Sequence, residues 1–302
     1  MDELIAKADV LLEALPYIDR FAGRTLVIKY GGSAMLNEEL RHGFAQDLVM
    51  LARLGIHPVV VHGGGPQIGE ALDRLGIETR FVRGLRVTSE AAMEVVEMVL
   101  AGKINKAIVN NIERHGTGAV GISGKDGNLI RASKLPMEIR GDDGKVETVD
   151  LGRVGRVEHV NIDVIEKLKQ GDYIPVIAPI GVDAEGASYN INADVVASKI
   201  AQALGAAKLI LLTDVHGILD GSGELQPFID VDTARAQTGQ GTIAEGMVPK
   251  VECAIEALHG GVKQVHIIDG RVSHAVLLEI FTKTGVGTEV VLSQDDVPNA
   301  SG

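Results

Sequence analysis

Two glycine-rich turns in the sequence each follow a run of apolar residues that is typical of a buried strand. One is HGGGPQIG at residues 62–69, and the other is KYGGSA at residues 29–34. A strand that passes through glycines into a helix presents free N–H groups and a positive helix end, which suit an anion such as a phosphate. A tight turn is the alternative, but three glycines cost conformational entropy where one would serve. Because such turns share one crevice at the carboxyl ends of parallel strands, they predict an anion site.

The common phosphate-binding patterns do not account for these glycines. The P-loop pattern, in which the second glycine is followed by Lys and Ser or Thr, is absent from the sequence. The dinucleotide fingerprint also fails, since Ile68 stands where a third glycine or alanine should follow Gly63 and Gly65. About twenty residues further on, Arg83 occupies the place of an acidic ribose ligand. A reductase that binds NADP through an irregular fingerprint stays open as an alternative.

Strands and helices alternate around both turns. Helices are expected from Asn37 to Gly55, from Pro66 to Gly76 and from about Ser89 to Ile112, on the apolar spacing and the residues at their ends. Later in the chain the alternation continues through YIPVIAPIGV, ADVVASKIAQALG, KLILLTDVHG, VPKVECAIEALHGG, KQVHIID and SHAVLLEIF. Continuous Val, Ile and Leu strands joined by helices predict an α/β fold with an open, mainly parallel sheet sandwiched between helices.

Three further features complete the expected organisation. Leu4, Ala8, Leu11, Leu15 and Ile18 have helical spacing, which predicts an N-terminal helical arm. The segment MEIRGDDGKVETVD reads as a β-hairpin insertion around its Gly-Asp-Asp-Gly turn. We expect residues 1–20 to form this helix, residues 21–180 one lobe and residues 181–302 a second lobe.

Composition restricts the partners. The 302 residues are 45% hydrophobic and can bury a full core, and 41 acidic against 29 basic residues give a net charge of −12. An acidic surface repels nucleic acid and anionic lipid, so neither is expected as a partner. The single cysteine, Cys253, favours a reducing compartment. The first 21 residues lack the basic start and apolar run of a signal peptide, so we expect a cytoplasmic protein.

Six motifs in order along the chain carry a resemblance: IKYGGSAM, VVVHGGGPQIG, RFVRGLRVT, NINAD, LLTDVHGILD and GMVPKVECA. Together they resemble the amino acid kinase family over residues 25–292. The resemblance implies an N-terminal lobe that binds an amino acid and a C-terminal lobe that binds ATP. RGLRVT and NINAD imply ATP-dependent phosphorylation of the side-chain carboxylate of N-acetyl-L-glutamate, the second step of arginine biosynthesis.

The resemblance assigns catalysis to Lys29, Lys250 and Asp194. The lysines would neutralise charge on the transferring phosphoryl group, and Asp194 would hold them in place. A solvated face is the ordinary role of a lysine, but Lys29 ends an apolar strand, and Lys250 lies at a helix start, where the dipole disfavours a cation. Asp194 could also cap the helix that follows it, and we expect both roles.

Binding residues follow from the same motifs. Gly64 and Gly65 would donate N–H groups to the substrate, while Arg86 and Asn190 would hold its α-carboxylate. The alternatives are a structural salt bridge for Arg86 and a turn role for Asn190. ATP would contact Gly32, Thr213, Asp214 and Gly217, and Mg²⁺ would arrive with the nucleotide, without dedicated protein ligands. His62 and His266 are expected to pack in the core or to support other groups.

The two ends of the chain resemble those of family members that L-arginine inhibits. The resemblance implies Glu279 as the partner of the cationic group of arginine, with Tyr17, His266 and Gly287 nearby. It also implies a homo-oligomer, a dimer that assembles into a hexamer through the N-terminal helices. A helix folded back on its own lobe is the alternative.

Two other functions stay open beside the NADP reductase. One is a kinase for a related acyl-amino acid, such as an aminoadipate or a carrier-linked substrate, because one methylene changes pocket length without changing the motifs. The other is a non-catalytic amino acid sensor on the same scaffold.

Overall fold

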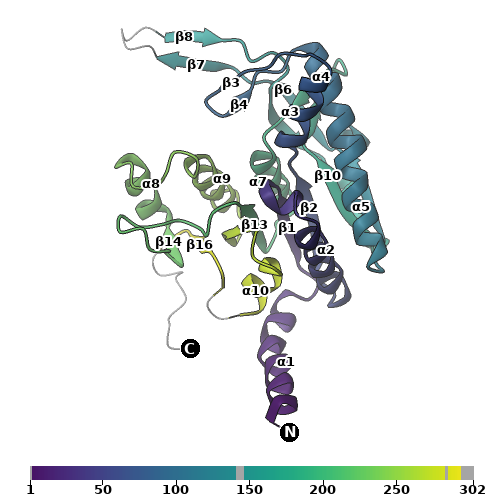
Figure 1. Ribbon diagram of the computed structural model, residues 1–302, viewed down its shortest axis with the longest axis vertical. Coiled ribbons are helices and arrows are strands. Elements are labelled where there is room, and N and C mark those ends of the chain that lie inside the picture. Colours follow the sequence, from purple (N-terminus) through teal and green to yellow (C-terminus); the bar gives the residue numbers. More distant parts are fainter. Residues whose placement is uncertain (1, 141–145, 283–284, 294–302) are drawn as a thin grey trace.

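The computed structural model describes residues 2–140, 146–282 and 285–293. Within these ranges an eight-stranded sheet forms the centre of the molecule, in the order β14-β16-β15-β13-β1-β2-β10-β5 (Figure 1). Neighbouring strands are parallel except for β15 and β16. The strands are β1 (Thr25–Tyr30), β2 (His57–His62), β5 (Ala119–Ser123), β10 (Ile174–Ala178), β13 (Lys208–Thr213), β14 (Phe228–Asp230), β15 (Gln264–Asp269) and β16 (Thr288–Val291).

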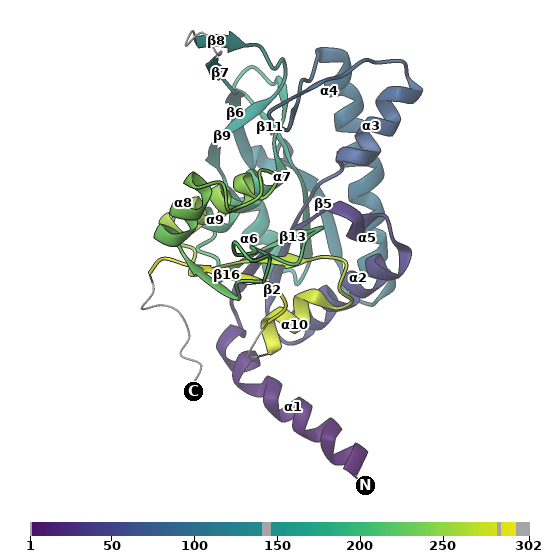
Figure 2. The same ribbon diagram turned by 60° about the vertical axis from the view of Figure 1, so that its left-hand side comes forward.

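Strand β1 shows how the two faces of the sheet are filled. Successive side chains of a strand point to opposite faces, so Ile28 enters one apolar cluster and Val27 enters the other. By the same alternation Lys29 lies on the face of Val27. The first cluster is covered by α2 (Glu38–Arg53), α5 (Asn105–Arg114) and α10 (Ala275–Phe281), and the second by α6 (Asp163–Gln170), α7 (Ala193–Ala203), α8 (Val231–Gly239) and α9 (Val248–His259) (Figure 2).

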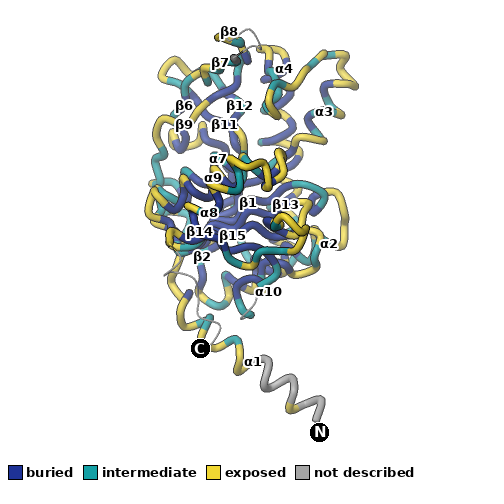
Figure 3. Tube along the Cα trace, turned by 90° about the vertical axis from the view of Figure 1, so that its left-hand side faces the viewer, coloured by how far each residue is buried: buried dark blue, intermediate teal, exposed yellow. Residues whose placement is uncertain are grey.

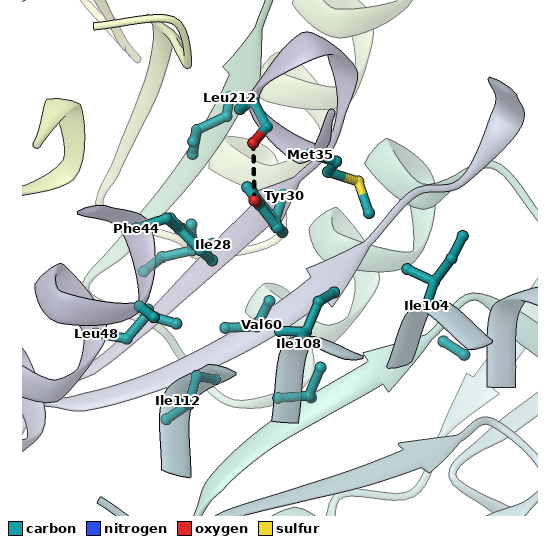
Figure 4. Packing of buried hydrophobic residues seen from close by; sticks show 14 of the residues in the cluster. Ile28, Tyr30, Met35, Phe44, Leu48, Val60, Ile104, Ile108, Ile112 and Leu212 are labelled. Carbon is teal, nitrogen blue, oxygen red and sulfur yellow. Dashed lines mark hydrogen bonds between the residues drawn. The ribbon is translucent and has the colours of Figure 1, made fainter. Parts of the chain in front are cut away.

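The first cluster packs closely against the strands that precede the glycine turns. Phe44 from α2 stacks on Tyr30 from β1, with ring centroids 3.9 Å apart. Ile108 and Ile112 from α5 face the sheet beside Val60 of β2 (Figure 4). The predicted open sheet between helices is confirmed.

The helix expected from Ser89 to Ile112 is interrupted. Ser89 caps α4 (Glu90–Glu97) by accepting a hydrogen bond from the N–H of Ala92, as its position indicates. A π-helical segment, Met98–Ile104, then separates α4 from α5. Apolar spacing does not distinguish a π turn from an α turn, and π segments are frequent at functional sites.

A second sheet lies beside the main one, where the family resemblance led us to expect a single sheet. It has the order β12-β11-β6-β9 and contains β6 (Ile130–Lys134), β9 (Gly155–Val160), β11 (Ile180–Val182) and β12 (Ser188–Asn190). The predicted hairpin is confirmed as β7 (Met137–Arg140) and β8 (Val146–Val149), while its turn falls outside the described residues. A further short hairpin pairs β3 (Phe81–Val82) with β4 (Leu85–Arg86), and α3 (Gly65–Arg74) follows the longer glycine run.

The N-terminal helix α1 (Asp2–Phe21) projects from the body of the molecule (Figure 3). Its C-terminal end packs against α10, whereas Ile5, Leu12 and Leu15 are exposed. The helix is therefore present as predicted, but it does not fold back along its own lobe. None of the described helices is long and apolar enough to cross a membrane.

Candidate active site

The two glycine turns lie side by side because β1 and β2 are parallel neighbours. Tyr30 and His62 are register partners at the carboxyl ends of these strands. The N–H of Gly63 donates to the carbonyl of Tyr30 over 2.8 Å, so the second turn is fixed to the first. Both turns open into one crevice, as their sequence positions predicted.

The shorter turn needs glycine for two different close approaches. A Cβ on Gly31 would lie 2.8 Å from Nζ of Lys29, whose side chain folds back over the turn. Gly32 has a φ of 72°, in the left-handed region, and a Cβ there would meet the Asp214 carboxylate at 2.4 Å. That carboxylate accepts hydrogen bonds from the N–H and hydroxyl of Ser33, at 2.7 and 2.6 Å. The turn thus joins β1 to the loop after β13.

The longer turn has a packing reason for its middle glycine. A Cβ on Gly64 would lie 2.4 Å from Cδ1 of Ile104 and 2.7 Å from Cδ2 of Leu100, both in the π-helical segment. A larger residue at this position would therefore displace the turn from its support rather than enter the crevice. Gly65 meets no such neighbour within 4 Å.

Asp194 lies between two lysines from different elements. Its Oδ1 is 3.1 Å from Nζ of Lys29 at the end of β1, and its Oδ2 is 2.6 Å from Nζ of Lys250 in the first turn of α9. All three side chains are at least four-fifths buried. These residues were predicted from three separate motifs, and the fold brings them together.

The expected capping role of Asp194 is wrong. The N-cap of α7 is Asn192, whose side-chain oxygen accepts a hydrogen bond from the N–H of Asp194 over 2.8 Å. Asp194 lies inside the first helical turn, where its carboxylate is free to reach the lysines and where the helix dipole stabilises negative charge.

Electrostatics keep Asp194 ionised. Burial raises the pKa of Asp194, but the charges of Lys29 and Lys250 outweigh burial and hold it below its usual value. Burial lowers the pKa of Lys29, and Asp194 opposes that shift. Two buried ammonium groups face one carboxylate here, so an incoming anion would complete the charge balance.

A cavity of about 250 Å³ lies between these groups and the β3–β4 hairpin. It is large enough for a small molecule and is lined by backbone as well as side chains. Seven of the residues that were predicted from the sequence line it: Lys29, Gly32, Gly64, Gly65, Arg86, Asn190 and Asp194.

Arg86 of β4 and Asn190 of β12 both line the cavity. The guanidinium of Arg86 donates to the carbonyl of Gly65 over 3.0 Å and lies 4.6 Å from the centre of the Phe81 ring. No salt bridge engages Arg86 within the described ranges, so its expected structural alternative is not found there. Asn190 donates to the hydroxyl of Thr88 over 3.3 Å.

Of the expected nucleotide residues, Gly32 lines the cavity, whereas Thr213, Asp214 and Gly217 lie at or after the end of β13, which pairs with β1 on the side away from β2. Thr213 is buried at the end of β13, where its carbonyl accepts a hydrogen bond from the N–H of Gly270. Gly217 has a φ of 146° and lies so close to Thr288 that a Cβ would meet its hydroxyl at 2.6 Å. Among the described residues no group of three or more His, Cys, Asp or Glu could hold a metal ion.

A second buried charge cluster joins β15 to α10. Nδ1 of His266 lies 2.6 Å from Oε1 of Glu279, and the N–H of Val286 donates to Oε2 over 2.6 Å. Nζ of Lys208 lies 2.7 Å from Nε2 of His266. Burial lowers the pKa of His266, so its ring is neutral and can accept a hydrogen bond from the lysine.

The other two residues expected near Glu279 are placed less directly. Gly287 follows Val286 and approaches the carbonyl of Ile267, at 2.3 Å from a hypothetical Cβ. Tyr17 lies on α1, which packs against the helix that carries Glu279.

Sequence reasoning missed three residues of these two sites. Lys208 is the first residue of an otherwise apolar strand and is buried. Because a buried ammonium group is costly without a partner, a lysine in such a strand is a signal that could have identified it. Gly31 and Asn192 stood inside quoted motifs, but only the structure shows which side chain each one accommodates or caps.

A doubly wound sheet whose first two strands end in paired glycine turns, with two lysines held by one aspartate, is the arrangement expected of a phosphoryl-transfer site on this architecture. Residues 24–269 match the model of the amino acid kinase family, and the chain belongs to that family.

Two similar relatives agree over nearly full length. Acetylglutamate kinase of Syntrophobacter fumaroxidans is 58% identical over 289 residues, which cover 95% of this chain and 97% of the relative. Acetylglutamate kinase of Geobacter sulfurreducens is also 58% identical, over 96% of this chain and 99% of the relative.

Solved structures repeat the fold. N-acetylglutamate synthase from Neisseria gonorrhoeae, complexed with coenzyme A and N-acetyl-glutamate, aligns with a TM-score of 0.82 and 25% identity. The alignment covers 95% of this chain but only 63% of the synthase chain. Carbamate kinase from Giardia lamblia bound to AMP-PNP aligns with a TM-score of 0.61 and 17% identity, over 90% of this chain and 99% of the other, which supports the fold alone.

Proposed function

We propose that this chain transfers the terminal phosphoryl group of ATP to the side-chain carboxylate of N-acetyl-L-glutamate, in arginine biosynthesis. The observation that carries the proposal is the Asp194 carboxylate between Lys29 and Lys250, at the wall of a cavity lined by both glycine turns. Relatives that are 58% identical over nearly the whole chain are acetylglutamate kinases.

The chemistry needs cations rather than a base. The acceptor carboxylate is already ionised at neutral pH, so no proton must be removed before it attacks phosphorus. The obstacle is the repulsion between an anionic acceptor and an anionic phosphoryl group. Lys29 and Lys250 reach Asp194 from two different elements and would neutralise charge on opposite sides of the transferring group.

Substrate recognition is assigned to the part of the cavity that Arg86 and Asn190 line. The fork of Arg86 would hold the α-carboxylate through two parallel hydrogen bonds, with Asn190 beside it. The N–H groups of Gly64 and Gly65 would donate to the reacting oxygens. We retain residues 21–180 as the proposed lobe for the amino acid and residues 181–302 as the proposed lobe for the nucleotide, with Asn190 and Gly32 each contributing to the site of the other lobe.

ATP is assigned to the part of the crevice between the end of β13 and Lys250 of α9. Its proposed contacts are Gly32, Thr213, Asp214 and Gly217. Both oxygens of Asp194 face lysines, so this carboxylate is not available to a metal. Mg²⁺ would therefore be held by the phosphates and water, and it would add positive charge to the phosphoryl oxygens.

The assay that tests this proposal traps the acyl phosphate product with hydroxylamine. We expect a hydroxamate from N-acetyl-L-glutamate and far less from glutamate, aspartate or N-acetylaminoadipate. Lys250→Met should lower the rate by about a hundredfold or more, as expected for a lost charge-stabilising donor. Faster turnover of N-acetylaminoadipate would contradict the substrate, and no hydroxamate from any acceptor would contradict the activity.

We also propose that L-arginine inhibits the enzyme by binding near Glu279 and His266, with Tyr17 and Gly287 close by. Among the buried groups of this cluster one ammonium faces two carboxylates, because Glu289 as well as Glu279 acts on Lys208, while the guanidinium of Arg20, which also acts on Lys208, is exposed; a buried guanidinium would therefore improve the charge balance. A second structure of the Neisseria gonorrhoeae synthase, complexed with coenzyme A and L-arginine, aligns with a TM-score of 0.78 and 25% identity.

The projecting helix supports an assembly of dimers into a hexamer, since Leu12 and Leu15 expose apolar surface that a second copy would cover. Deletion of residues 1–20 should reduce particle size and arginine sensitivity together. A truncated protein of unchanged size would contradict the role of the helix. We retain the cytoplasm as the expected compartment, on the single cysteine of the sequence.

A further inference from the structure

His62 lies directly beneath the longer glycine turn and is completely buried at the end of β2. Its Nδ1 is 2.9 Å from the carbonyl oxygen of Gly63. A carbonyl can only accept, so Nδ1 carries the proton and Nε2 is bare. The partners of the ring therefore define one neutral tautomer.

Asn105 fixes the other side of the ring. Its amide nitrogen lies 3.2 Å from Nε2 of His62 and 2.9 Å from the carbonyl of Val176. Its amide oxygen accepts a hydrogen bond from Nζ of Lys106 over 3.1 Å, and this contact sets which end of the amide faces the ring. The network is satisfied on both sides and holds His62 in one orientation.

The carbonyl of Gly63 shares its peptide unit with the N–H of Gly64. No described peptide bond is cis, so this carbonyl and this N–H point in opposite directions. A ring that holds the carbonyl on the buried side directs the N–H away from the core, and Gly64 lines the cavity on that other side. No hydrogen bond within the described part of the chain occupies the Gly64 N–H.

The π-helical segment and the first residue of α5 together support this turn. Leu100 and Ile104 pack where a Cβ of Gly64 would stand, and Asn105 follows at the first residue of α5. A π turn places an additional residue in the helix, which changes the direction in which the following side chains point. Leu100 and Ile104 thus determine the position of the Gly63–Gly64 peptide group, and Asn105 determines its orientation through His62.

We propose that His62 is a positioning residue for phosphoryl transfer: it holds the Gly63 carbonyl and thereby directs the Gly64 N–H to the reacting oxygens. The inference rests on the proposed function for its reaction and on the hydrogen bonds above for its geometry. His62 is not among the residues that line the cavity, and it acts through the peptide unit that it orients.

Two substitutions separate orientation from packing. The amide nitrogen of Asn can take the place of Nδ1 in a histidine, whereas that of Gln takes the place of Nε2. Both His62→Asn and His62→Gln remove the ring, but only the first keeps a donor for the Gly63 carbonyl. We expect kcat to fall about tenfold to a hundredfold in His62→Gln, with KM for N-acetyl-L-glutamate changed less than threefold. His62→Asn should stay within about fivefold of the unaltered protein.

A control at the other end of the same strand, His57→Gln, should leave kcat and KM unchanged. Equal losses of kcat in His62→Asn and His62→Gln would show that the ring only fills space and would overturn the proposal. Normal kinetics in His62→Gln would overturn it too.

A measurement without turnover covers the case in which the variants do not fold. In protein labelled with ¹⁵N-histidine, NMR should show His62 with its proton on Nδ1, and a proton on Nε2 would overturn the inference. If the unaltered protein makes no acyl phosphate, the proposed function fails, whereas a proton on Nε2 removes the hydrogen bond itself. The two failures are therefore distinguishable.

Discussion

Asp194 and Glu279 are two buried carboxylates in this molecule, and their charge environments are opposite. Asp194 faces two ammonium groups, from Lys29 and Lys250, at the wall of a cavity. Glu279 faces a neutral imidazole and a backbone N–H, and the buried charges of its cluster are one ammonium, Lys208, against two carboxylates.

The difference shows what each cluster can accept. An excess of buried positive charge around Asp194 favours an anion, as the transfer of a phosphoryl group requires. An excess of buried negative charge around Glu279 favours a cation instead. Because the oxygens of Glu279 are satisfied within the protein, this cluster also fastens α10 to β15.

We expect the largest effect from removing the charge of Asp194. Asp194→Asn leaves two unshielded buried lysines, which repel each other and lose their positions. We expect kcat to fall by a factor of about 10² to 10³, on the order of 3–4 kcal/mol of transition-state stabilisation. The hydroxylamine assay measures it. A kcat within threefold of the unaltered protein would remove Asp194 from the mechanism.

The matching substitution in the other cluster should act on stability first. Glu279→Gln replaces one accepting oxygen of the carboxylate with an NH₂ group, so either Nδ1–H of His266 or the N–H of Val286 loses its acceptor, which costs about 1–3 kcal/mol of the free energy of unfolding. We expect less than a tenfold change in kcat, together with loss of arginine inhibition. Urea titration and the enzyme assay measure the two effects. A fall in kcat as large as that of Asp194→Asn would show that the clusters are not separate.

The Glu279 cluster should also respond to alkaline pH. Burial lowers the pKa of Lys208 from 10.5 to about 8, so between these values the unfolded chain binds a proton that the folded chain does not. The free energy of unfolding therefore gains from this lysine as pH rises and loses as pH falls. The unaltered protein should gain on the order of 2 kcal/mol relative to Lys208→Met between pH 8 and pH 10. If the free energy of unfolding changed with pH in the same way in both proteins, the lowered pKa of Lys208 would be contradicted.

The smallest effect is expected from removing the helix cap beside Asp194. Asn192→Ala removes the cap of α7 and should cost about 1 kcal/mol of the free energy of unfolding. Asn37→Ala removes the equivalent cap of α2 and is the matched control. Because Asn192 orders the helical turn that carries Asp194, only Asn192→Ala should also lower kcat, by a few-fold. Equal kcat values for the two variants would show that Asp194 does not depend on its cap.

Much of the fold followed from local pattern. The strands before the glycine turns, the cap at Asn37 and the hairpin all have signals within a few residues, and the structure confirms them. The π-helical segment has no such signal, because its apolar spacing matches that of an α-helix. Strand β14 and helix α8 were not predicted, since the short segment before Val231 alternates too little to identify a strand.

The sequence predicted which residues would meet at the candidate site, but it did not predict their contacts. Lys29, Asp194 and Lys250 came from motifs far apart in the chain, and the fold brings them within 3.1 Å. The cap was assigned to the wrong residue, because Asn192 and Asp194 are both good capping types and only backbone geometry decides between them. Lys208 was passed over because its partners, His266 and Glu289, lie on other strands.

The central place of β1 has a consequence for synthesis on the ribosome. β1 pairs on one side with β2, which follows it closely, but on the other side with β13, whose residues come much later. At about 5–20 residues per second, roughly 10 to 40 s pass before that partner exists. During this interval the nascent chain carries an unpaired apolar edge beside Lys29, a template for aggregation that a chaperone would have to shield.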